Sequence, residues 1–198
     1  MLNALYQLTE KITRLSALMG GMLILFSAFL ITIDIILRKV FTISIGGADE
    51  LSSYALAIGS SWALGYALFC RANIRVDVIC YMLPLKLRVV VDLLALIALG
   101  VVVAVCSIYV FYTLADSWQF DSHANTPLQT PLVIPQLLWF IGFVVCVWTF
   151  ILLFIKSSVA IFQGKFNEVN GVIGTRSIKE EINDETHLVK VEQQANGG

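Results

Sequence analysis

The sequence predicts an all-α integral membrane protein: a four-transmembrane-helix bundle with both termini in the cytoplasm. Of the 198 residues, 58% are hydrophobic and only 14% are charged, whereas a soluble domain has about 45–50% apolar and about 25% charged residues. Long uncharged runs alternate with short charged segments, as membrane spans require. The net charge of −1 and the lack of a basic cluster give no support to a nucleic-acid partner.

The uncharged runs predict spans at about 15–37, 51–70, 90–115 and 135–156, within a membrane domain of residues 15–160. The first run, from Leu15, holds 19 uncharged residues before Asp34, and a bilayer core about 30 Å thick needs about 20 helical residues. A cleaved signal peptide is the alternative, but its apolar region is shorter. Pro135 suits a first helical turn, whereas Pro127 and Pro131 predict that 126–134 is extended.

The two ends of the chain differ from the spans. Leu2, Leu5, Leu8 and Ile12 recur at steps of three and four, so residues 1–14 form either an interfacial amphipathic helix or the start of the first span. Both readings remain open. Residues 161–198 are rich in acidic residues, which predicts a solvated, mostly disordered cytoplasmic tail.

The basic residues predict the orientation, because lysine and arginine are retained in the cytoplasm. Four spans place both termini and the 71–89 connection on one side. Eight basic residues fall on that side: Lys11, Arg14, Arg71, Arg75, Lys86, Arg88, Lys156 and Lys165. Only Arg38 and Lys39 fall on the other side. The connections around 40–49 and 116–134 are therefore expected to face outward.

Charged residues near the outer ends of the spans are the first candidates for a site. Asp34 precedes Arg38 by four residues, which predicts a local ion pair closing the first span. An ion relay would require further acids within the uncharged runs, which have none; Asp92 directly precedes the third run. Asp49 is expected to be the N-cap of the second span, and Glu50 suits its positive end. Capping leaves both acids able to contact a partner.

The second span carries a stripe of small residues at a four-residue step: Ala55, Gly59, Ala63 and Ala67. Membrane helices lack a hydrophobic drive to associate and use such small faces for close packing. The stripe packs either inside the bundle or against another subunit. Trp118 and Trp139 are expected at the outer interface, and Trp62 and Trp148 between helices.

Nothing in the sequence predicts a catalytic, cofactor or metal site. Catalytic motifs with a known mechanism are absent. His123 and His187 lie outside the apolar runs, which argues against haem, and the four cysteines form no C-x-x-C pair. A four-span redox protein would need paired cysteines on the outer side, whereas Cys70 and Cys80 map to the inner side. A free-standing channel or regulatory membrane protein is the other alternative.

A series of short motifs then appears in order along the chain. It comprises Asp34-x-x-x-Arg38, Asp49-Glu50-Leu51, Trp62-Ala-Leu-Gly65 running to Arg71, Asn73-Ile-Arg75-Val-Asp77, Thr130-Pro131 running to Pro135-Gln136, and Gly142-Phe143. Over about residues 15–155 this series resembles the small, DctQ-type membrane subunit of tripartite ATP-independent periplasmic (TRAP) transporters. The sequence departs from the family at Asn73, where histidine is common, and in the Gly-Ala-Asp-Glu entry to the second span.

The resemblance implies a non-catalytic role in the bacterial inner membrane. In such systems a periplasmic binding protein captures an organic acid, and a large membrane subunit imports it with sodium. The small subunit supports the large one and helps dock the binding protein. The expected large-subunit interface is Ala55, Gly59, Trp62, Ala63, Ala67, Arg71, Arg75 and Asp77, of which the last two can instead pair with lipid phosphate and nearby lysines. The expected docking residues are Asp49, Glu50, Asp116, Asp121 and His123.

Overall fold

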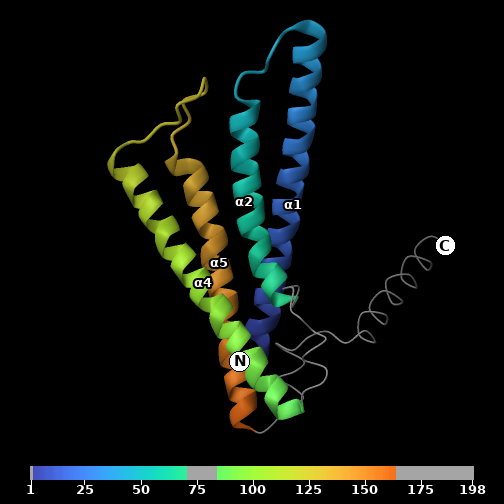
Figure 1. The fold of residues 1–198 in the computed structure, drawn as a ribbon, viewed down its shortest axis with the longest axis vertical. Helices are drawn as coiled ribbons and strands as arrows, with labels where there is room; N and C mark the ends of the chain where they lie inside the picture. Colours follow the sequence, from blue (N-terminus) through green and yellow to red (C-terminus); the bar gives the residue numbers. More distant parts are fainter. Residues whose placement is uncertain (1, 71–83, 164–198) are drawn as a thin grey trace, which may run out of the picture.

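Four helices make up the part of the chain that the computed structural model describes, residues 2–70 and 84–163 (Figure 1). They are α1 (Leu2–Phe41), α2 (Ala48–Phe69), α4 (Leu85–Gln119) and α5 (Val133–Phe162). Each contains most or all of one predicted span, and all but the second extend beyond it at both ends. No β-strand occurs in these residues, apart from one isolated bridge between His123 and Pro131. The all-α prediction agrees with this architecture.

The helices alternate in direction along the bundle (Figure 1). The starts of α1 and α4 therefore lie at the same end as the last turns of α2 and α5. The opposite end carries residues 42–47, which join α1 to α2, and residues 120–132, which join α4 to α5; we call it the loop end. Helix α2 packs against both α1 and α5, and α4 packs against α5.

Three of the helices are long and apolar enough to cross a membrane by length and composition: α1, α4 and α5. Helix α2 is not among them, because its serines, glycines and tyrosines lower its mean hydropathy. It is also covered on two sides, by α1 and α5, so less of its surface needs to be apolar. The count of four membrane crossings stays a prediction.

Helix α1 is continuous through the predicted boundary between residues 14 and 15. Its first turns pack on the neighbouring helices: the Tyr6 ring lies 4.6 Å from that of Phe69, and the Lys156 ammonium lies 3.4 Å from the Tyr6 ring centre. The Trp148 indole donates to Thr9 Oγ1 at 3.1 Å. These contacts hold the N-terminal segment along the bundle axis. The predicted tail, apart from residues 161–163 at the end of α5, lies outside the described residues.

Small and hydroxylated residues make the contact between α1 and α2. A Cβ built on Gly20 would lie 2.7 Å from the carbonyl oxygen of Gly59, so the two backbones meet directly. The Thr13 and Ser27 side chains are buried and donate to carbonyls of their own helix, Thr9 O and Ile24 O. The close approach follows from the absence of side chains at the crossing.

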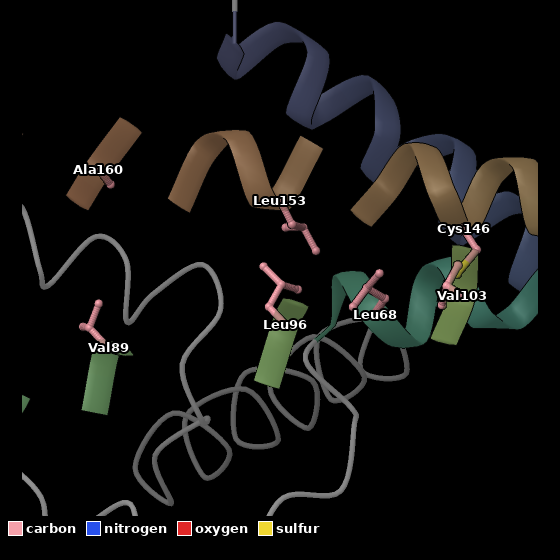
Figure 2. Packing of buried hydrophobic residues seen from close by; sticks show 7 residues of the cluster. All are labelled: Leu68, Val89, Leu96, Val103, Cys146, Leu153 and Ala160. Carbon is pink, nitrogen blue, oxygen red and sulfur yellow. The ribbon is translucent and has the colours of Figure 1, made fainter. Parts of the chain in front are cut away.

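A hydrophobic cluster joins α4 and α5 and includes Leu68 of α2 (Figure 2). Its buried members are Leu68, Val89, Leu96, Val103, Cys146, Leu153 and Ala160. The Phe150 ring lies directly over Gly100, and a Cβ there would force the ring to move. Cys146 is a packing residue within this cluster.

The Gly20 contact makes a testable prediction. Gly20→Ala is expected to lower the free energy of unfolding by about 1–3 kcal/mol, because the added methyl must push the α1 and α2 backbones apart. Gly21→Ala is the control: nothing lies within 4 Å of its added Cβ, so the substitution should be neutral or slightly stabilising. Thermal or denaturant unfolding in detergent measures both. Equal effects of the two variants would contradict the proposed backbone contact.

Candidate functional site at the loop end

The Asp34 carboxylate organises the connection between α1 and α2. It is buried at the last turns of α1 and receives Arg38 Nη2 at 2.5 Å, the Ser44 hydroxyl at 3.1 Å and the Ile45 amide at 2.7 Å. A buried carboxylate is tolerated only when donors replace its water. The predicted helical neighbour Arg38 therefore supplies one donor of three, and the following loop supplies the other two.

A second buried carboxylate, Glu50, joins the two connections. Tyr54 on the next turn of α2 donates to Oε1 at 2.9 Å, and the Thr126 hydroxyl donates to Oε2. Thr130 also bonds to this carboxylate. Glu50 precedes the apolar part of α2. Its hydrogen-bond donors, of which Thr126 has the largest effect, hold the pKa of its carboxyl below the usual range. The 120–132 connection is thereby fastened to the start of α2.

Gly47 provides a further contact between the connections. It has a φ of 102° and is the N-cap of α2, a position that the sequence predicted for Asp49. The Leu128 side chain occupies the space where a Cβ of residue 47 would lie. Only glycine both adopts this backbone conformation freely and leaves room for Leu128.

The 120–132 connection is ordered by its own hydrogen bonds. The Ala124 amide donates to Thr130 O, and the Leu132 amide donates to Ser122 O, both at 3.0 Å. They flank the His123–Pro131 bridge, which gives the connection a short antiparallel arrangement. Helix α5 then begins at Val133, two residues before the predicted Pro135.

The predicted docking residues divide into two groups. Asp49, Asp116, Asp121 and His123 are exposed, and the Asp49 side chain is 84% accessible, with its carboxylate 4.0 Å from Arg38 Nη2. Glu50 is buried, and its carboxylate accepts hydrogen bonds from within the chain. It therefore holds the 120–132 connection in place instead of presenting its charge to a partner. The partners of Glu50 among residues 126–130 were missed from sequence, because nothing in a threonine's local pattern indicates a contact 76 positions away.

The predicted large-subunit residues also divide. Ala55 and Gly59 are buried inside this chain, whereas Ala63 and Ala67 are half-buried. Trp62 donates from Nε1 to Leu138 O of α5 at 2.8 Å, and is thus anchored between helices. Arg71, Arg75 and Asp77 lie outside the described residues.

The described residues contain no group of three or more His, Cys, Asp or Glu side chains that could hold a metal ion. The three cysteines in this part of the chain are free and lie in different surroundings: Cys70 ends α2, Cys106 is exposed on α4, and Cys146 is buried. This arrangement gives no support to a dithiol site among them.

Comparison with known families decides the relationship. The family model described as "Tripartite ATP-independent periplasmic transporters, DctQ component" matches residues 27–159, about two thirds of the chain. The chain belongs to the DctQ family. A DctQ component is part of a transporter rather than an enzyme, and its family works with a large membrane subunit and a binding protein. No curated protein and no solved structure gave a match.

The Glu50 contacts of this DctQ component predict the behaviour of the loop end. Glu50→Gln removes the charge that attracts the threonine hydroxyls, so the 120–132 connection should open more often. Hydrogen–deuterium exchange of the Ala124 and Leu132 amides is expected to accelerate about tenfold. Asp116→Asn, an equal charge change on an exposed side chain, should leave these amides unchanged. Unaltered exchange in Glu50→Gln would show that Glu50 does not hold the connection.

Proposed function

We propose that this DctQ component is the scaffold subunit of a TRAP-type secondary transporter that imports an organic acid with sodium. In this proposal all four helices cross the bacterial inner membrane, with both termini in the cytoplasm. The chain supports the large membrane subunit and helps to dock the periplasmic binding protein. The family match over residues 27–159 carries the proposal.

The interior of the described helices supports a role without substrate binding. Transporter cores bind solutes at interrupted helices with free polar groups near the midplane. Here the helices run without a break. Several buried hydroxyls donate to carbonyls one turn back, as in Ser61 to Ile58 O at 2.8 Å and Thr149 to Val145 O at 2.8 Å, with Ser157 of α5 as an exception. A hydroxyl whose hydrogen is already donated to its own helix is not free to donate to an anionic solute.

The loop end is the surface that we propose for the binding protein. Asp121 lies in the 120–132 connection, and Asp49 and Asp116 lie in the helical turns beside the two connections. The buried Asp34 and Glu50 carboxylates hold these connections in place. A preorganised surface loses less conformational entropy on binding. The charges Asp49, Asp116 and Asp121 suit a partner with a basic patch, and His123 lies on the same connection as Asp121.

We keep in the proposal those residues of the predicted large-subunit interface that are accessible in the structure. Ala63 and Ala67 are half-buried on α2, beside the anchored Trp62. Arg71, Arg75 and Asp77 are proposed to continue that contact on the cytoplasmic side. Ala55 and Gly59 act inside the bundle and support α2 from within.

A reconstitution experiment tests the function. The associated binding protein is first screened against a panel of carboxylates by thermal shift. Its radiolabelled ligand is then offered to proteoliposomes that hold the large subunit with or without this chain. Uptake is expected only with all three proteins and an inward sodium gradient, and a potassium gradient is the control. Uptake by this chain alone, or full uptake without it, would overturn the proposal.

A charge experiment tests the docking surface. Asp49→Asn with Asp121→Asn should slow association of the binding protein by about three- to tenfold at low salt, because electrostatic attraction mainly raises the on-rate. The difference should vanish near 1 M salt, where the screening length is about 3 Å. Surface plasmon resonance on the nanodisc-embedded complex measures both. Glu10→Gln, an exposed acid at the opposite end, is the matched control and should have no effect.

A further inference from the structure

Helix α1 contacts the rest of the chain along one regular seam. The residues of this inner seam recur at alternating steps of three and four, and none is exposed. They are Tyr6, Thr9, Thr13, Ser16, Gly20, Leu23, Ser27, Leu30, Asp34 and Leu37. A repeat of 3.5 residues is the period at which one helix follows another along its length. The orientation of α1 toward the bundle is therefore constant from its second turn to its last turns.

The residue before each inner-seam position, about 100° round the helix, is large and apolar without exception. We call this set, with Val40, the outer seam. It comprises Leu5, Leu8, Ile12, Leu15, Met19, Met22, Phe26, Phe29, Ile33, Ile36 and Val40. Their exposure ranges from 38% to 66%, so the described chain leaves the whole row uncovered.

The other flank of the inner seam is different in character. Its exposed positions are Gln7, Glu10, Arg14, Gly21, Ala28, Ile35 and Arg38, of which only Ile35 is large and apolar. Leu18 and Leu25 are also exposed farther round the helix, but the outer seam has a large apolar side chain at every position. A helix that faced lipid alone would have no reason to keep one flank uniformly large and apolar while the other flank is mostly charged, polar or small. The asymmetry indicates a partner on the outer-seam side.

The outer seam is longer than the hydrocarbon core of a bilayer. From Leu5 to Val40 the helix rises about 53 Å, whereas a hydrocarbon core about 30 Å thick covers about 39 Å even of a helix tilted by about 40°. The first turns are held against α2 and α5 through Tyr6 and Thr9, so they cannot lie flat in the interface. The start of the seam therefore extends beyond the hydrocarbon. It comprises Leu5, Leu8 and Ile12, which lie beside the charged Glu10, Lys11 and Arg14.

We propose that a membrane helix of the large subunit packs along the outer seam of α1, including the turns that extend out of the hydrocarbon. The inference rests on the proposed function, which supplies the partner. The outer seam also predicts the geometry of the contact. The partner helix should lie nearly parallel or antiparallel to α1 over a long distance, with side chains interlocking at the 3.5-residue repeat. This contact is separate from the one at Ala63 and Ala67 of α2.

Photo-crosslinking in membranes that contain the complete transporter tests the proposal. A benzophenone amino acid is placed singly at Leu8, Met22 and Ile33 of the outer seam, and at the exposed Leu94 of α4 as control. Adducts with the large subunit are expected from all three seam positions, with yields at least about tenfold above that from Leu94. Adducts with a second copy of this chain, or with lipid alone, would overturn the assignment.

Paired charge substitutions provide the quantitative test. Leu8→Glu is expected to reduce the large subunit recovered with the tagged chain by about tenfold, the size of one interface hot spot. Leu87→Glu is the matched control, because Leu87 lies at the same end, on α4, and is similarly exposed, at 50% against 55%. Equal recovery in the two variants would refute the outer-seam contact while leaving the proposed function intact. A wild-type chain that recovers no large subunit would refute the function itself.

Discussion

The direct backbone contact between Gly20 and Gly59 is the interaction on which the remaining packing depends. In a bilayer, apolar side chains gain little by leaving lipid for one another, so helices associate through close fit and hydrogen bonds. Two glycines at one crossing let α1 and α2 approach until their backbones touch. Helix α2 is thereby set deep enough to pack on α5 as well, and α5 in turn carries α4.

The loop end follows a second rule, that a charge leaves water only when donors receive it. Asp34 and Glu50 are both buried, and each draws part of a connection onto the helices. Because Gly47 and Leu128 also touch, the two connections form one surface. The exposed acids on that surface are placed by neighbours that carry no exposed charge themselves.

The side chains around helix α1 connect its packing to the proposed scaffold role. The buried positions of its inner seam, Thr9, Thr13, Gly20, Ser27 and Asp34, are small or polar. The Thr13 and Ser27 hydroxyls are turned toward their own backbone. The large apolar side chains of the outer seam form an adjacent face that the described residues leave uncovered. Such a face is available to a partner outside the chain, as the proposed scaffold role requires.

The sequence by itself determined the helical class, the positions of the long helices and the family, because uncharged runs and the order of short motifs are local properties. It also indicated the Asp34–Arg38 neighbours, which are one helical turn apart. Only the tertiary structure decided that Glu50 meets Thr126, that Leu128 covers Gly47, and that Thr9 and Thr13 face inward while Leu8 and Ile12 face outward. The reason is physical: in a membrane the surroundings are as apolar as the interior, so hydrophobicity marks a span but does not say which face lies inside.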